Sequence, residues 1–189
     1  MAKEWKWLPT LGVLVLAVTV SLGGFVVAGD LASSVPDADA PVPSGPGIPI
    51  GLGASLHPLP GWTEADRFQD PEGVRVSKGV ASLDAYALSF TGSPDDLVQD
   101  YLVNGLQSQA SQLQVTSSES VVLAGGLQGV RISYVGVFGN EAAAIEGEVT
   151  AGVTADGLGM VFDGWTQQGQ YGFVQGEVRA MVEGVTVGG

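Results

Sequence analysis

Few side chains in this chain could act as nucleophiles, general bases or metal ligands, since it has one histidine and no cysteine. A Ser-His-Asp triad would have to use His57, which lies in a proline-rich turn, and no Gly-x-Ser-x-Gly motif presents a serine. The missing cysteines exclude disulfides, thiolate catalysis and cysteine zinc sites. We therefore expect no catalytic residues, no cofactor and no resident metal ion.

Two groups of carboxylates could still form a binding site. Asp66, Asp70 and Glu72 surround a turn, but their spacing is not that of an EF-hand, so a solvated loop explains them. Glu146 and Glu148 lie on the same side of one predicted strand, where they could meet a cationic partner or act as general acid and base. A polar sheet face is the simpler interpretation of this pair.

Two tryptophans are the strongest candidates for contact with a partner. Trp62 ends a turn, and Trp165 falls on the strand face opposite Met160 and Phe162. Trp165 is therefore either covered by a helix as part of the core or exposed as a contact. The candidate partner-contact residues are Trp165, Trp62, Glu146 and Glu148.

The uncharged segment from Leu8 to Ala28 predicts where these residues function. At ~1.5 Å per residue it reaches ~31 Å as a helix, about the thickness of the bilayer hydrocarbon. Lys3 and Lys6 precede it, which by the positive-inside rule places residues 1–7 in the cytoplasm and the rest outside. As a signal anchor it makes a single span of the cell membrane; alternatively, cleavage near Ala28 releases a secreted protein.

The charge balance limits the class of partner. The chain has a formal net charge of −13, and the residues before Asp30 contribute +1, so the part outside carries −14. Nucleic acid is an unsuitable partner, because phosphate contacts require clustered Lys and Arg. The acidic surface also disfavours lying flat on anionic lipid.

Composition divides the remaining chain into a linker and a folded domain. Residues 29–47 are rich in Pro, Ala and Asp, which predicts a semi-extended linker. Residues 48–189 form the domain, in which alternating apolar positions predict several strands. These strands cover 48–56, 74–78, 80–90, 115–123, 130–138 and 145–153, and one begins at 158. Turns at Gly139-Asn140 and Asp156-Gly157 join the last three into an antiparallel meander.

Two helices are expected to pack on this sheet. The first begins at Ser93, a capping residue, with Pro94 in the first helical position. Its apolar stripe consists of Val98, Leu102, Leu106, Ala110 and Leu113. The second runs from about Gln170 to Glu183 and is followed by a short strand over 185–187.

The order of these elements resembles that of a known family. Its marks are the Leu-Pro-Gly-Trp turn at 59–62, the glycine turn at 125–129 before a Tyr-bearing strand, and the terminal helix that ends at 180–185. The chain resembles the PsbP/MOG1-like fold, in particular the exported actinobacterial lipoproteins of that group. The resemblance implies an α+β domain, an α/β/α sandwich with helices on both faces of an antiparallel sheet. It also implies binding or assembly roles and no shared catalytic residues, although the acylated cysteine of those lipoproteins is absent here.

These observations favour a non-enzymatic, membrane-tethered extracytoplasmic domain, an accessory subunit that contacts another envelope or membrane protein. The alternative is a carrier or sensor that holds a small apolar ligand between sheet and helix. A hydrolase is the third possibility. An apolar cavity would favour the carrier, and a flat apolar patch around Trp165 would favour the protein contact.

The predicted topology can be tested with a reporter fused after Val187. We expect activity only when the reporter is of a type that works outside the cytoplasm, because Lys3 and Lys6 orient the preceding segment. Activity of a cytoplasmic reporter at the same position would contradict this placement.

Overall fold

The computed structural model describes residues 46–139 and 144–188. All of them belong to one compact unit, residues 36–189. The expected membrane segment, 8–28, and nearly all of the linker lie outside the described residues. Within the part of the chain that is described, no helix is both long and apolar enough to cross a membrane.

The main sheet of the domain is antiparallel, with the strand order β3-β4-β5-β10-β9-β8-β6. β7 also pairs with β8, beside the end of β6. The strands are β3 Thr63–Gln69, β4 Glu72–Lys78, β5 Ala81–Ser89, β6 Ala110–Val115, β7 Glu119–Val122, β8 Gln128–Phe138, β9 Ile145–Val153 and β10 Leu158–Gln167. β8, β9 and β10 form the expected meander.

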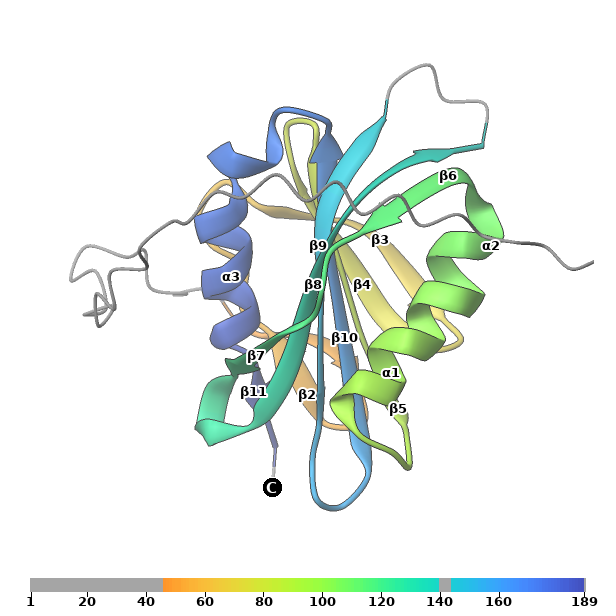
Figure 1. Cartoon of the computed structure of the whole chain (residues 1–189). Coiled ribbons are helices and arrows are strands. Elements are labelled where there is room, and N and C mark those ends of the chain that lie inside the picture. Colours follow the sequence, from red (N-terminus) through yellow and green to blue (C-terminus); the bar gives the residue numbers. More distant parts are fainter. Residues whose placement is uncertain (1–45, 140–143, 189) are drawn as a thin grey trace, which may run out of the picture. The chain divides into compact units, whose positions relative to one another are not determined.

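Helical segments cover both faces of this sheet (Figure 1). One face carries a continuous helical segment and is called the helix face. The segment consists of α1 Pro94–Asp100, the π-helical η1 Tyr101–Leu106 and α2 Gln107–Gln109. The other, the α3 face, carries η3 Tyr171–Phe173 and α3 Gln175–Glu183, together with a small sheet. That sheet is formed by β1 Ile48–Gly51, β2 Ala54–Leu56 and β11 Thr186–Val187. The expected layers, with helices on both faces of an antiparallel sheet, are therefore present.

The first helix begins as its sequence predicts. Ser93 Oγ accepts a hydrogen bond from the Asp96 N–H at 3.2 Å, and Asp96 Oδ2 accepts one from the Ser93 N–H at 2.8 Å. This reciprocal pair satisfies two N–H groups at the helix start, and Pro94 follows at the first position, where it needs no donor.

The predicted end of that helix is wrong. The segment ends at Gln109, and Ala110–Val115 forms strand β6. The middle of the segment, Tyr101–Leu106, is a wider π-helical turn, and Leu102 within it is only half-buried, whereas Leu97 of α1, outside the predicted stripe, is buried. The spacing of apolar residues in the sequence predicts neither the end of the helix at Gln109 nor the π-helical turn.

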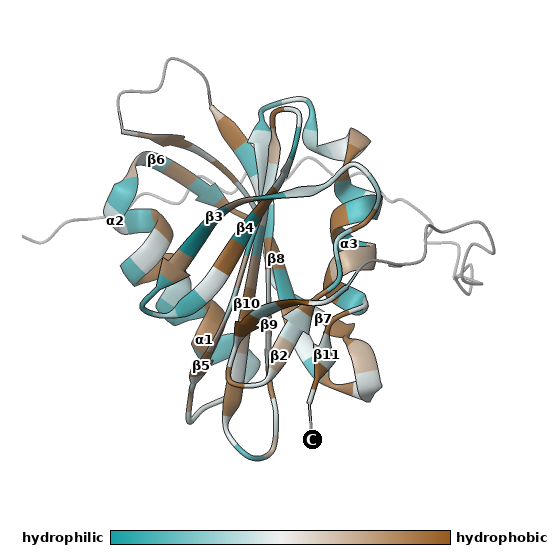
Figure 2. Ribbon diagram, turned by 180° about the vertical axis from the view of Figure 1, so that it is seen from behind, coloured by the Kyte–Doolittle hydropathy of each residue, from teal (hydrophilic) through white to brown (hydrophobic). Residues whose placement is uncertain are grey.

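Two other strand predictions also differ from the structure. The single strand over 48–56 is a hairpin, because Gly51, Leu52 and Gly53 have φ values of 101°, 49° and 80° and reverse the chain between β1 and β2. β3 was not predicted, since its mostly exposed, hydrophilic residues show no apolar alternation (Figure 2). Residues 115–123 fall at the end of β6 and in β7.

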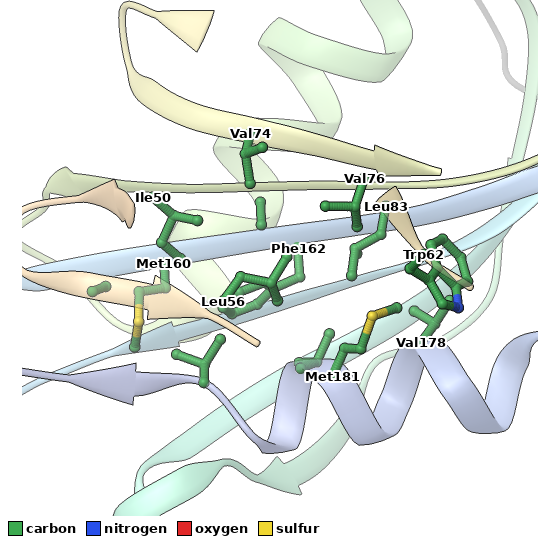
Figure 3. Close-up of a cluster of buried hydrophobic side chains, with 14 of the residues drawn as sticks. Ile50, Leu56, Trp62, Val74, Val76, Leu83, Met160, Phe162, Val178 and Met181 are labelled. Carbon is green, nitrogen blue, oxygen red and sulfur yellow. The ribbon is translucent and has the colours of Figure 1, made fainter. Parts of the chain in front are cut away.

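β10 divides the interior into two apolar clusters, because its side chains alternate between the faces. Met160 and Phe162 point into the cluster under α3, with Met181 and Val178 of that helix (Figure 3). Val161 belongs to the cluster under the helix face. Asp163, two residues further, points to that same helix face, where it bonds Tyr101.

Leu97 should be a principal anchor of the first helix. It is buried, and its Cδ2 packs closely on β10: a Cβ added to Gly159 would lie 3.0 Å from this atom. We expect Leu97→Ala to lower the free energy of unfolding by ~2–5 kcal/mol, measured by urea unfolding. Val103→Ala, at an exposed position of the same segment, should change it by less than about 1 kcal/mol. Equal effects of the two substitutions would mean that α1 is not anchored by this face.

Candidate functional site

A half-open pocket of about 220 Å³ lies between the sheet and the end of the first helical segment. Tyr101, Leu106 and Gln109 line it from the helical segment, and five strands of the main sheet supply the other residues. These are Arg75, Asp84, Tyr134, Phe138, Ile145, Asp163 and Trp165. The pocket thus combines aromatic rings with three charged side chains.

Strand register brings the three charged residues into one row. Arg75 of β4 is opposite Asp84 of β5, and Asp84 is opposite Asp163 of β10. Directly opposed residues of an antiparallel sheet point to the same face, so all three side chains reach the helix face. Residues separated by 88 positions along the chain are neighbours for this reason.

Asp163 lies at the base of the pocket, with 3% of its surface exposed. The Tyr101 hydroxyl donates to Oδ2 at 2.7 Å, and the Tyr134 hydroxyl donates to Oδ1 at 2.8 Å. Asp163 forms no ion pair within residues 46–139 and 144–188. Two phenols therefore hold its carboxyl, and none of the described residues is a cationic partner of its own.

This environment changes the proton affinity of the carboxyl. Burial raises the pKa of Asp163 to about 7, because desolvation disfavours the charged form more than the two phenolic hydrogen bonds favour it. The nearby charge of Asp84 raises this pKa further, and Arg75 lowers it. Burial and the Asp163 charge also raise the pKa of Tyr101 and of Tyr134, so both phenols remain donors.

Arg75 forms the charged side of the pocket. It donates two parallel hydrogen bonds to Asp84, from Nε to Oδ1 at 2.6 Å and from Nη2 to Oδ2 at 2.7 Å. Its guanidinium carbon lies 5.7 Å from the ring centre of Phe68 and 5.5 Å from that of Trp165. The Arg75 charge is thus shared between one carboxylate and two aromatic rings.

Trp165 has an intermediate position between the two that the sequence allowed. It is half-buried against the cluster under the helix face, and it lines the pocket beside Arg75. The residue is neither sealed in the core nor fully exposed, which leaves part of its ring available to a ligand.

Trp62, by contrast, is buried in the cluster under α3, with 5% of its surface exposed (Figure 3). Its Nε1 donates to Glu177 Oε2 at 2.6 Å, and Lys78 Nζ donates to the same carboxylate. Trp62 therefore connects the turn before β3 to α3 as a buried residue, with little surface left for a partner.

The two candidate glutamates of β9 lie on the α3 face, away from the pocket. Glu148, 4% exposed, accepts hydrogen bonds from Arg179 at 2.6 and 3.0 Å and from Gln175 at 2.6 Å. Burial opposes its ionisation, but these bonds outweigh burial and lower the pKa of Glu148. Glu146 accepts a hydrogen bond from the backbone N–H of Tyr171. Arg131 Nε lies 3.8 Å from the same carboxylate, so Glu148 is paired with two cations of its own chain.

The remaining candidates stay apart from the pocket. His57 Nε2 lies 3.1 Å from Thr186 Oγ1, which joins β11 to the end of β2. Asp66 is an exposed residue of β3, and Asp70 lies in the turn before β4. No group of three His, Cys, Asp or Glu side chains that could hold a metal ion occurs among the residues described.

Of the residues that line the pocket, the sequence singled out Trp165 alone, and its charged and phenolic members were missed: Arg75, Asp84, Tyr101, Tyr134 and Asp163. One signal was present: Asp163 is a charged residue in the middle of an apolar strand, on the same face as Val161. A charge at such a position requires buried partners.

No model of a known protein family matches the chain, and no curated protein matches its sequence. The solved structures that share its fold include the following two. The cyanobacterial PsbP (CyanoP) of Synechocystis sp. PCC 6803 is 16% identical, with a TM-score of 0.51, over 72% of this chain and 87% of that one. LpqN, involved in cell envelope biogenesis of Mycobacterium tuberculosis, is 10% identical, with a TM-score of 0.53, over 72% and 83%. The fold is PsbP-like, as the sequence resemblance implies, and it is shared with an actinobacterial protein.

The raised pKa of Asp163 predicts a pH dependence of stability. Between its ordinary pKa of ~3.9 and about 7, the folded protein holds a proton that the unfolded chain has released, so the free energy of unfolding falls as the pH rises across this window and levels off above about 7. Relative to Asp163→Asn, which does not titrate, the wild-type free energy of unfolding should fall by about 2–3 kcal/mol between pH 5 and pH 8. Urea unfolding of both proteins at several pH values measures this difference, and a constant difference would contradict the assignment.

Proposed function

We propose that this protein is a membrane-tethered, extracytoplasmic accessory domain without enzymatic activity that contacts another envelope or membrane protein. The uncharged segment at 8–28 and the linker at 29–47 support the tether, and the charge of −13 argues against nucleic acid. The PsbP-like fold is shared with LpqN, a protein involved in cell envelope biogenesis, and this likeness supports a location in the cell envelope.

The observation that carries this proposal is the half-buried Trp165 beside the half-open pocket. Trp, Tyr and Arg are enriched among the residues that contribute most to protein interfaces. Here Trp165, Arg75 and Tyr101 line one site. Arg75 is already held by Asp84 and stacked on the indole, so binding would cost little side-chain entropy.

A carrier of a small apolar ligand is the second candidate, because the pocket lies between sheet and helix as such a site requires. Leu106, Phe138 and Ile145 give it apolar walls. The Asp163 carboxyl at the base makes an entirely apolar ligand a poor match, since such a ligand would leave this polar group without further compensation. We therefore rank the protein contact first.

Trp165→Ala should weaken partner capture. We expect at least a tenfold loss of the captured partner from detergent-solubilised membranes, because truncating a central interface tryptophan commonly costs ~2 kcal/mol or more. The matched control is Phe173→Ala, which removes an aromatic ring that is 86% exposed and lies before α3. Quantitative crosslinking and pull-down of the full-length proteins measures both.

The melting temperature separates loss of contact from loss of fold. A contact residue gives reduced capture with little change in melting temperature, whereas a drop of several degrees would assign Trp165 a core role. Capture that depends on Phe173 and not on Trp165 would place the contact elsewhere and overturn this proposal.

A further inference from the structure

We infer that the pocket on the helix face binds a primary ammonium group, with the Asp163 carboxylate as its counter-ion inside the aromatic walls. This inference deepens the proposed function and rests on the same site.

The charges of the pocket lead to this conclusion. Arg75 and Asp84 neutralise each other through two short hydrogen bonds. Asp163 has two phenolic donors and forms no ion pair among the described residues. A buried carboxylate without a cation is costly, so a ligand that supplies one positive charge gains most at this position.

The hydrogen-bonding capacity of the carboxyl agrees with an ammonium ligand. Each oxygen of a carboxylate can accept about two hydrogen bonds. Tyr134 uses one acceptor position on Oδ1, and Tyr101 uses one on Oδ2. Each oxygen of Asp163 therefore retains capacity for an N–H donor, and an ammonium group carries three.

The walls of the pocket suit the rest of such a ligand. Tyr101, Tyr134, Phe138 and Trp165 line the space, and aromatic rings attract cations through their negative faces. Leu106 and Ile145 provide apolar surface for a hydrocarbon stem. A volume of about 220 Å³ accommodates an alkylammonium chain.

Other cations fit less well. A divalent ion such as Ca²⁺ takes six to eight oxygen ligands. Asp163 and Asp84 are the carboxylates that line this pocket, and Asp84 is already bound to Arg75. No three-residue cluster of metal-ligating side chains lies in the described ranges.

The ammonium group could belong to a lysine of a protein partner or to a free small amine. The chemistry recognised at Asp163 is the same in both cases. The net charge of −13 attracts either kind of ligand, since an acidic field raises the local concentration of cations.

Calorimetric titration of the full-length protein in neutral detergent tests this inference. The probes are n-butylammonium, the uncharged n-butanol, and lysine blocked as its Nα-acetyl N-methylamide. We expect the ammonium probes to bind and n-butanol to bind at least tenfold more weakly. Equal affinity for n-butanol and n-butylammonium would overturn the inference.

Two variants locate the binding. Asp163→Asn should weaken n-butylammonium at least tenfold. The matched control is Glu148→Gln, which neutralises another buried carboxylate on the opposite face and should leave the affinity unchanged. Unchanged affinity in Asp163→Asn would overturn the site.

The pH dependence keeps the test valid even if Asp163→Asn fails to fold. Wild-type affinity for n-butylammonium should be constant above pH ~7 and fall up to about tenfold per pH unit below it, because the protonated carboxyl is no counter-ion. The titratable and charged groups around this carboxyl are Tyr101 of η1, Tyr134 of β8, Arg75 of β4, the β5 residues Asp84 and Tyr86, and Tyr171 of η3. Equal affinity at pH 6 and pH 8 would contradict Asp163 as the counter-ion.

The same data separate this inference from the proposed function. Blocked lysine that binds more tightly than n-butylammonium supports a protein partner as the source, and equal or weaker binding supports a free amine. Partner capture that depends on Trp165 without any ammonium binding would retain the proposed function and refute the inference. Ammonium binding without partner capture would retain the inference and refute the proposed function.

Discussion

The two hydrogen bonds accepted by the buried Asp163 carboxyl join three separate elements of the domain. Tyr101 donates from η1, Tyr134 donates from β8, and Asp163 itself belongs to β10. Inside a protein an unpaired polar group is expensive, so each of these three side chains requires the others to stay in place. The helical segment is thereby held at a fixed distance from the sheet, and the pocket is the space that remains beside these polar contacts.

The same carboxyl explains why the two faces of the sheet differ. On the α3 face, Glu148 is paired with Arg179, and Glu177 is paired with Lys78, so these two carboxylates have cations from the same chain. On the helix face, Arg75 pairs with Asp84, and in the part of the chain that is described Asp163 accepts hydrogen bonds from two phenols and forms no ion pair. Among the described residues, the α3 face therefore pairs Glu148 and Glu177 with cations, whereas the helix face leaves the Asp163 carboxyl without one.

Local signals in the sequence predicted much of this fold. The cap at Ser93, the turn at Asp156-Gly157 and the alternation along β8, β9 and β10 depend on neighbouring residues, and all three are present. The site depends on register and on packing over long separations. Tyr101 and Asp163 are 62 positions apart, and their contact also requires the π-helical turn, which has no apolar periodicity of its own. The side of β9 that carries Glu148 was predictable, but its partner Arg179 was not, since that pairing is set by how α3 packs.

The hydrophilic strand β3 has a further consequence for how copies of this protein behave when crowded. An edge strand offers unpaired backbone groups to any other strand, and natural proteins protect such edges with charges and bulges. β3 carries Glu64, Asp66 and Arg67, and its register with β4 shifts between Glu64 and Asp66. Aggregation by strand pairing through this edge is therefore disfavoured, and β3 remains the last strand of the sheet, next to the strand β4 that carries Arg75. At high concentration, copies of this acidic protein can therefore remain separate molecules, each with its pocket accessible.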